Sequence, residues 1–373
     1  MIYLDYNATT PVDESVVQAM RKAMLENWGN PSSGHAIGKK AKIAYEKARK
    51  QVASLITSES SEIIFTSGGT ESNNLVLLGL ALHFAPHKNH IITSKIEHPS
   101  VINPCLNLLE QGFKVSFISV DKYGIVDLNE LEDAITDQTF LVSVMLANNE
   151  TGALQPIKEI AEICSRHQVL LHSDAAQAVG KVAVDVKELG VDYLTIAGHK
   201  LYAPKGIGAL FVKQGRPIEK TMYGAGQEFD KRPGTEPVPG AVGLGEAAFL
   251  VKKDLAKEET RQQTLRERLF KGLKAIFPQI VRHGKADNTL PNTLSISFPG
   301  IAASDLLAKM DGLCASTGAA CHDQSMAVSH VLAAMGVSKE VALGTVRLSL
   351  GRYTTEAEID EALRLFNSAI SSI

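Results

Sequence analysis

A lysine and an aspartate in this chain combine reactive residue types with a placement that suits chemistry. Lys200 follows the apolar run 193–197, and Asp174 ends a second run that begins at residue 169. Such runs are typical of buried strands in an open α/β sheet, which binds ligands at the carboxyl ends of its strands. A lysine there can hold an aldehyde cofactor as a Schiff base, while a carboxylate keeps a pyridine nitrogen protonated. The pair therefore indicates a site for pyridoxal phosphate.

Each member of the pair also has a simpler interpretation when it is taken alone. Lys200 could be a surface lysine after a strand, and Asp174 could cap a helix. The cofactor hypothesis therefore depends on the other polar segments of the chain.

A glycine turn provides a candidate phosphate site. Residues 66–74 read Thr-Ser-Gly-Gly-Thr-Glu-Ser-Asn-Asn, between an apolar run that ends at Phe65 and an apolar helical pattern. A glycine turn that opens a helix presents unpaired N–H groups and the positive end of the helix dipole, and Thr70 adds a hydroxyl. An ordinary strand-to-helix turn would show the same residues.

Three further polar positions lie where strands are expected to end. His98 precedes a proline at a predicted helix start, and its flat imidazole could stack on a cofactor ring. Residues 148–152 close the apolar run 141–146, and their amides could bind a phenolate or a carboxylate. Gln177 would face the same side as Asp174 if a helix begins there. A capping histidine and a plain turn are the alternatives.

Among the four cysteines, Cys321 is the candidate nucleophile. It lies in the stretch 316–325 of small and polar residues, which is expected to expose the thiol. Cys105 and Cys164 have apolar helical surroundings that favour burial, and Cys314 ranks below Cys321. The cysteine spacing fits neither a zinc site nor a disulfide framework.

Arg347 is a candidate ligand for a carboxylate. The segment 346–350 alternates apolar and polar residues as a strand does. A guanidinium held on a strand can clamp a carboxylate with two parallel hydrogen bonds, as an enzyme of amino acids needs. An ion-paired surface arginine is the alternative, and Arg352 is a nearby competitor.

The composition excludes several classes of function. The chain has 373 residues, 45% of them hydrophobic, which is enough for two domains, and 38 basic and 41 acidic residues give a net charge of −3. The sequence shows no basic cluster for nucleic acid, no signal segment and no apolar stretch that could span a membrane. We expect a cytoplasmic protein whose partners are small molecules or proteins.

The apolar pattern predicts an α/β fold. Between residues 39 and 212 amphipathic segments alternate with short apolar runs, which indicates helices that cover a mostly parallel sheet. The predicted strands are 91–93, 115–120, 141–146, 169–172, 193–197 and 209–212. The predicted helices are 39–56, 71–84, 99–111, 157–167 and 242–275.

A second, smaller domain is expected in the last third of the chain. From residue 293 apolar runs at 294–298 and 346–350 mix with helical stretches at 303–310 and 356–370. The predicted division is a large domain at 13–255 and a small α+β domain at 1–12 and 256–373 that carries the Cys321 loop.

Together these segments resemble the cysteine desulfurase and selenocysteine lyase family, of the class V aminotransferase type and pyridoxal phosphate fold type I. The matching segments follow the order of the family: 3–11, 29–33, 66–74, 148–152, 172–177, 198–200 and 347–355. The resemblance implies a large domain with a mostly parallel seven-stranded sheet covered by helices, and a smaller α+β domain.

The resemblance also implies roles around the cofactor. Lys200 would carry the cofactor and move protons, Asp174 would pair with the pyridine nitrogen, and His98 would stack on the ring. Gln177 and Asn149 would contact the phenolate side.

Further implied roles concern the phosphate and the substrate. Gly69, Thr70 and His199 would hold the phosphate. Thr235 would reach the phosphate of a neighbouring subunit, which implies a homodimer. The substrate carboxylate would be bound by Asn7, Asn149 and Arg347.

The activity that the resemblance implies is removal of sulfur from L-cysteine. The products are L-alanine and a persulfide on Cys321, which passes to an acceptor such as an iron–sulfur scaffold protein. One alternative is a selenocysteine lyase acting on L-selenocysteine, and another is an aminotransferase of the same fold, which has no use for Cys321. A non-enzymatic scaffold would need the loss of Lys200, which is present.

The chain departs from the family pattern in three places. Ala197 replaces a serine that many desulfurases use on the phosphate. Ala225 and Phe229 interrupt a stretch that usually reads as three glycines followed by Gln, Glu and Arg. Residues 318–322 read Gly-Ala-Ala-Cys-His, which leans toward selenocysteine lyase and leaves the choice between sulfur and selenium open.

Overall fold

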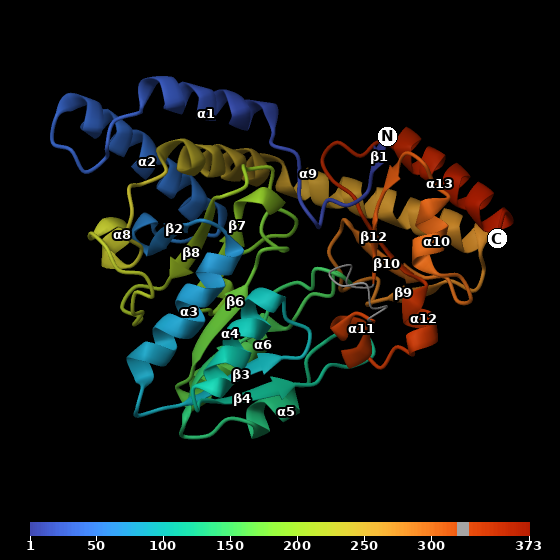
Figure 1. Ribbon diagram of the computed structural model, residues 1–373, viewed down its shortest axis with the longest axis horizontal. Coiled ribbons are helices and arrows are strands. Elements are labelled where there is room, and N and C mark those ends of the chain that lie inside the picture. The colour runs from blue at the N-terminus through green and yellow to red at the C-terminus, as the bar shows by residue number, and fades with distance from the viewer. Residues whose placement is uncertain (319–327) are drawn as a thin grey trace.

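The computed structural model describes residues 1–318 and 328–373 and contains two main sheets (Figure 1). The strands of the large sheet lie between residues 63 and 212, and those of the smaller one between 281 and 349. The predicted nucleophile Cys321 lies outside the described residues.

The large sheet has seven strands, and β8 runs antiparallel to both of its neighbours while the other strands share one direction. Every residue of β3, β5, β6 and β7 is buried, as expected of a sheet covered on both faces. This confirms the predicted mostly parallel sheet. Across the sheet the strands are β2 (Ile63–Thr66), β8 (Gly208–Val212), β7 (Tyr193–Ala197), β6 (Leu170–Asp174), β5 (Thr139–Ser143), β3 (His90–Ser94) and β4 (Lys114–Ile118).

Helices cover both faces of this sheet because successive residues of a strand point to opposite sides. On β3, Ile91 packs in the core formed with α3 and α4, whereas Ile92 packs in the core formed with α2, α6 and α9. The helices of this region are α1 (Glu14–Glu26), α2 (Ala36–Leu55), α3 (Gly69–Phe84), α4 (Pro99–Glu110), α5 (Leu128–Asp133), α6 (Ile157–His167), α7 (Val186–Leu189), α8 (Gln227–Asp230) and α9 (Val238–Ile276).

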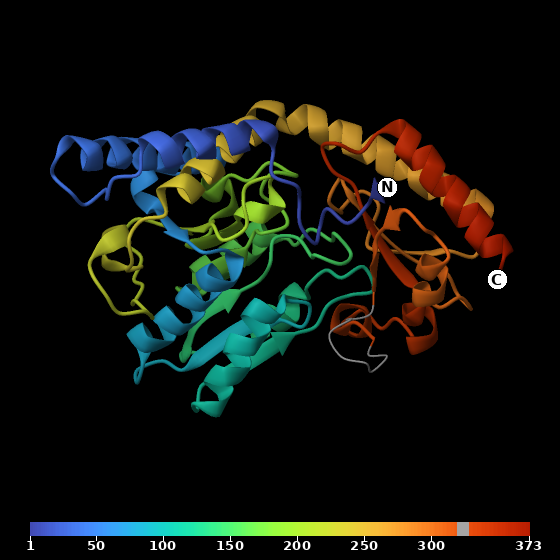
Figure 2. The ribbon, with the colours of Figure 1, turned by 45° about the horizontal axis from the view of Figure 1, so that its top comes forward.

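The smaller sheet is antiparallel, and the N-terminus of the chain packs beside it (Figures 1 and 2). Its strand order is β12 (Ser316–Thr317), β13 (Thr345–Ser349), β10 (Thr293–Ser297) and β9 (Val281–His283). Strand β1 (Ile2–Tyr3) pairs with β11 (Leu313–Cys314), so the first residues of the chain join its last third. The remaining helices are α10 (Ala303–Ala308), α11 (His330–Ala334), α12 (Lys339–Leu343) and α13 (Glu356–Ser371).

The long helix α9 runs past both sheets and changes its core along the way (Figure 2). Val251 packs in the core of the large sheet, whereas Leu265 packs in the core of the smaller one. The predicted boundary at residue 255 lies between these two positions and stays a prediction, which this change of core supports. The helix begins at Val238, earlier than the predicted 242, because Pro239 is tolerated in the first turn of a helix.

Two predicted segments need correction. The strand predicted at 141–146 ends at Ser143, although the N–H groups of Val144 and Leu146 still bond carbonyls of β6 as an irregular extension. Gln177 lies in a turn after β6 and not in the first turn of a regular helix, because Gly180 with φ +89° ends any helical path.

Candidate active site

The carboxyl ends of the parallel strands converge on one edge of the large sheet. Asp174 is the last residue of β6, and Lys200 ends the short 3₁₀ turn that follows the neighbouring strand β7. Strand β3 precedes His98, and β2 precedes the N-terminus of α3. Since open α/β sheets bind ligands at this edge, the fold gathers polar groups from distant parts of the sequence.

A cavity of about 490 Å³ lies at this edge. Ten of the predicted site residues line it: Asn7, Gly69, Thr70, His98, Asn149, Asp174, Gln177, His199, Lys200 and Arg347. Thr235 is exposed and does not line this cavity, so its role in a neighbouring subunit stays a prediction. The role of Cys321 also stays a prediction.

Lys200 is a half-buried lysine among cationic neighbours. Its Nζ donates to the backbone carbonyls of Asn7 and Ala8, the latter at 2.8 Å. Burial and, to a lesser extent, the charge of Arg347 together lower the pKa of Lys200 from its ordinary 10.5 to about 8, against the opposing charges of Asp5 and Asp174. About a tenth of this amine is therefore uncharged at pH 7 and able to act as a nucleophile or base.

Asp174 is held by groups that leave its carboxylate facing the cavity. Its Oδ2 accepts a hydrogen bond from Asn73 Nδ2 at 2.7 Å, and its Oδ1 accepts one from the N–H of Ala176 at 2.9 Å. Asn73 in turn donates to Ser100 Oγ at 2.8 Å. Asn73 belongs to the glycine-turn segment, but its amide was not predicted to orient Asp174.

The N-terminus of α3 forms an anion cradle. The first N–H groups of a helix have no partner inside it, and among the described residues no side chain caps this one. A Cβ added to Gly69 would lie 3.5 Å from the methyl of Ala197, so this side of the cradle is apolar. The missing serine hydroxyl at position 197 thus leaves Thr70 and His199 as the polar side chains lining the cavity here.

His98 caps helix α4 with a neutral ring. Its Nδ1 accepts from the N–H of Ser100 at 3.1 Å, which places the ring proton on Nε2. Burial lowers the pKa of His98, although Asp174 opposes the shift. The histidine therefore presents an uncharged face to the cavity.

The guanidinium of Arg347 is anchored from both ends. Its Nη1 donates to the carbonyl of Asn149 at 2.9 Å, and its Nη2 donates to Asp5 Oδ1 at 2.7 Å and to Ser316 Oγ at 2.9 Å. Its Nε is buried and has no partner among the described residues, which leaves a donor for a ligand. Asp5 was not predicted to hold this arginine.

Asn7 forms hydrogen bonds to several residues around the cavity through its side chain and its backbone. Its Nδ2 donates to Thr293 Oγ1 at 2.8 Å, and its Oδ1 accepts from Asn292 Nδ2 and Lys181 Nζ at 3.0 Å each. Its backbone carbonyl accepts from Lys200 and Gln177. The predicted contact between the Asn7 amide and a substrate carboxylate stays a prediction, because these internal partners already engage both ends of the amide.

These residues fit pyridoxal phosphate. The cavity is of a size that suits a small cofactor. It combines a partly neutral lysine, a carboxylate with free lone pairs, a flat neutral imidazole and an uncapped helix N-terminus. Each of these groups matches one part of the cofactor: aldehyde, pyridine nitrogen, ring face and phosphate.

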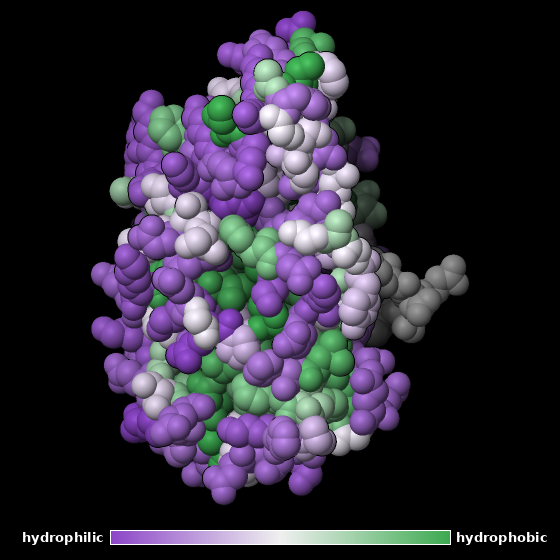
Figure 3. All heavy atoms as spheres, turned by 90° about the vertical axis from the view of Figure 1, so that its left-hand side faces the viewer, coloured by the Kyte–Doolittle hydropathy of each residue, from purple (hydrophilic) through white to green (hydrophobic). Residues whose placement is uncertain are grey.

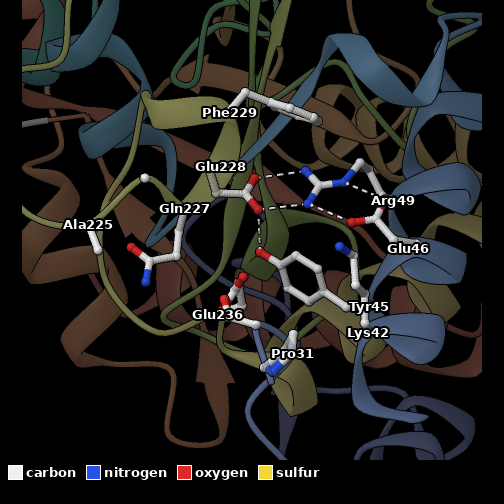
Figure 4. A pocket seen from close by; sticks show the side chains of 12 residues that line it. Pro31, Lys42, Tyr45, Glu46, Arg49, Ala225, Gln227, Glu228, Phe229 and Glu236 are labelled. Atoms are coloured by element: carbon white, nitrogen blue, oxygen red, sulfur yellow. Dashed lines mark hydrogen bonds and ion pairs between the residues drawn. The ribbon is translucent and has the colours of Figure 1, made fainter. Parts of the chain in front are cut away.

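A second cavity of about 520 Å³ lies between α2 and the segment around α8 (Figure 4). Glu228 Oε1 accepts from Tyr45 and from Arg49 at 2.7 Å each, and Glu228 Oε2 accepts from the N–H of Phe65 at 2.6 Å. Phe229, which departs from the family pattern, covers the Arg49 guanidinium with its ring centre 5.1 Å away. The buried ion pair between Arg49 and Glu228 thus fixes the segment around α8, which differs from the family pattern, against α2.

The comparisons with known proteins agree with this geometry. The sequence model of the family "Aminotransferase class-V" matches residues 2–362. The cysteine desulfurase IscS of Methanosarcina thermophila is 44% identical over 100% of this chain and 92% of its own length. Cysteine desulfurase 2 of Trichormus variabilis is 47% identical over 98% of this chain and 92% of its own length. A solved NifS-like protein superposes with a TM-score of 0.94 at 38% identity over all of both chains. The chain therefore belongs to the class-V aminotransferase family and, within it, to the cysteine desulfurases.

Proposed function

We propose that this enzyme uses pyridoxal phosphate to remove sulfur from L-cysteine, with L-alanine and a persulfide on Cys321 as products. The observation that carries the proposal is the Lys200 amine with its lowered pKa, which shares one cavity with Asp174 and Arg347. The identity to cysteine desulfurases over nearly the whole chain supports it.

Some residues of the cavity bind the cofactor and the substrate, and Lys200 transfers protons. When bound, pyridoxal phosphate supplies a ring that can take up electrons from the substrate's Cα–H bond. Asp174 holds the pyridine nitrogen, the α3 N-terminus holds the phosphate, and Arg347 holds the substrate carboxylate. Lys200 Nζ takes the proton from Cα and returns a proton later, because its lowered pKa suits both tasks near neutral pH.

Sulfur transfer needs a thiolate nucleophile, which we assign to Cys321. Its Sγ forms a bond to the sulfur of L-cysteine while the bond between that sulfur and Cβ breaks. The carbon skeleton keeps the electron pair, gains the thiol proton of the substrate and leaves as L-alanine. No oxidant is required, since the thiolate and cysteine become a persulfide and alanine with all atoms balanced.

The wider setting of the enzyme is also a proposal. The persulfide would pass to an acceptor protein such as an iron–sulfur scaffold, in the cytoplasm. Among the described residues, no helix has both the length and the apolar character needed to cross a membrane.

We further propose a homodimer in which Thr235 serves the partner's cofactor. Large aromatic side chains are exposed near the α1–α2 turn and α8: Trp28 is 68% exposed and Tyr223 is 80% exposed. Figure 3 views the side of the molecule that carries these segments, and apolar surface is visible there among polar groups. A second copy would cover such surface.

Turnover of both amino acids tests the function and its alternative. Purified protein is assayed with L-cysteine and with L-selenocysteine under reductant, and alanine, sulfide and selenide are counted. We expect alanine and sulfide in equal amounts from L-cysteine, and loss of this activity in Cys321→Ala. Cys314→Ala is the matched control and should keep it.

The opposite result would favour the selenocysteine lyase. In that case only L-selenocysteine would be consumed, and Cys321→Ala would retain the activity. Turnover that depends on an added keto acid would instead indicate an aminotransferase.

A further inference from the structure

Lys181 is a buried lysine directly behind the cavity wall. It follows Gly180, whose φ is +89° and where an added Cβ would lie only 3.0 Å from Leu201 Cβ, so this turn favours glycine. The turn directs the Lys181 side chain inward, where only 8% of the residue remains exposed. No role was predicted for this residue.

The amine of Lys181 bonds two neutral oxygens. Its Nζ donates to Gln177 Oε1 at 2.5 Å and to Asn7 Oδ1 at 3.0 Å, and no described carboxylate forms an ion pair with it. Burial, with help from the charges of Lys200 and Arg347, lowers its pKa well below 10.5. A neutral amine has two N–H donors, which matches the two acceptors.

The contacts define the orientation of the Gln177 amide. Its Nε2 lies 2.9 Å from the backbone carbonyl of Asn7, which can only accept a hydrogen bond. The NH₂ end of Gln177 must therefore face Asn7, and Oε1 must face Lys181. A flipped amide would place donor against donor at Lys181 and oxygen against oxygen at Asn7.

The other acceptor of Lys181, the amide of Asn7, is oriented in the same way. Asn7 Nδ2 lies 3.3 Å from the carbonyl of Asn149, again an obligate acceptor, so Asn7 Oδ1 is the end that faces Lys181. Lys181 thus connects two side chains of the cavity wall whose orientations are both determined by backbone carbonyls.

We propose that Lys181 is a positioning residue for the cofactor site: by donating to Gln177 Oε1 and Asn7 Oδ1, it keeps the second N–H of Gln177 free to bind an acceptor in the cavity. The acceptor would be the phenolate oxygen of pyridoxal phosphate, so the inference rests on the proposed function. Without the amine, Gln177 Oε1 loses its buried donor, and only the carbonyl of Asn7 still holds the amide in this orientation.

The test is a double-mutant cycle on the holoenzyme. Lys181→Met removes the donor and keeps an unbranched side chain of similar length, and Gln177→Met removes the amide. The readouts are the midpoint of the pH titration of the bound cofactor's visible absorbance, and kcat/KM for L-cysteine. Lys187→Met, an exposed lysine of the same segment, is the control and should change neither.

Each single variant is expected to move the absorbance midpoint upward by about one unit and to lower kcat/KM roughly tenfold, as loss of one buried hydrogen bond predicts. The reason for the upward shift is that an N–H donated to the phenolate reduces its basicity. The kcat/KM of the double variant should be within about twofold of that of Gln177→Met, because Lys181 acts through that amide.

Two outcomes would overturn the inference. An unchanged midpoint in Lys181→Met would show that the lysine does not orient Gln177. Full additivity in the double variant would show that it acts by another route, as a merely structural residue would. Lys181→Leu repeats the cycle if Lys181→Met does not fold. Sulfide release by the wild type tests the proposed function separately, and the absorbance midpoint tests Lys181 even if no sulfide is released.

Discussion

Arg347 donates to Asp5 Oδ1 at 2.7 Å, so the guanidinium that faces the cavity is held in place by a carboxylate from the other end of the chain. The contact joins β13 to the segment after β1 and fixes which donors of Arg347 remain available. Its buried Nε is the donor left without a partner among the described residues. A preoriented guanidinium loses little entropy when it binds a carboxylate.

Replacing Arg347 with lysine should therefore weaken substrate binding. We expect Arg347→Lys to raise KM for L-cysteine roughly ten- to hundredfold with a smaller change in kcat, since one ammonium cannot replace the fork geometry. Steady-state kinetics measures this. Arg352→Lys is the matched control, because Arg352 bonds Asp13 and does not line the cavity. An equal rise of KM in both variants would contradict the assignment.

The lowered pKa of Lys200 predicts how cofactor loading depends on pH. Only the neutral amine attacks an aldehyde, and the neutral fraction grows as pH rises through the pKa of about 8. The rate at which apoprotein takes up pyridoxal phosphate, followed by visible absorbance, should rise up to about pH 9 and then level off. A rate that keeps climbing toward pH 10.5 would indicate an ordinary lysine. Lys200→Ala should not develop the absorbance.

Asp174 is expected to matter for chemistry more than for folding. Asp174→Asn removes the charge that keeps the pyridine nitrogen protonated, and we expect kcat to fall about a hundredfold or more. The thermal midpoint should change little, because the new amide oxygen can still accept from the N–H of Ala176 while its NH₂ group donates to Asn73 Oδ1, a buried acceptor without a partner among the described residues, once the Asn73 amide turns over. Measured kcat near that of the wild type would show that Asp174 does not serve the cofactor.

The buried pair of Arg49 and Glu228 is expected to stabilise the fold. Their side chains are 3% and 4% exposed, so Arg49→Met would leave a carboxylate buried without its partner. The expected loss in the free energy of unfolding is about 3 kcal/mol, measured by urea denaturation. Arg364→Met removes an exposed ion pair with Glu361 and should give no measurable change. Equal effects of the two variants would argue against a special role for the buried pair.

The sequence by itself predicted six of the seven strands of the large sheet, all but β2, and the residues at the centre of the cavity. Buried parallel strands are nearly continuous apolar runs, and the polar residue that follows each run lies at the edge where ligands bind. Asp174, His98 and Lys200 were found by this local rule, and the structure places all three around one cavity. The predicted ends of strands and helices were less accurate than their centres. The hydrogen bonds that decide where a strand ends, as at Ser143, leave no pattern in the local sequence.

Only the tertiary structure decided how the cavity residues are held. Lys181 follows a glycine turn and reads locally as a surface lysine, yet its acceptor Asn7 comes from the N-terminal segment. Asp5 reaches Arg347 in the same way, from the opposite end of the chain. These contacts depend on how the N-terminal segment passes between the two sheets, and periodicity reports which face of an element is buried but not which distant residue meets it.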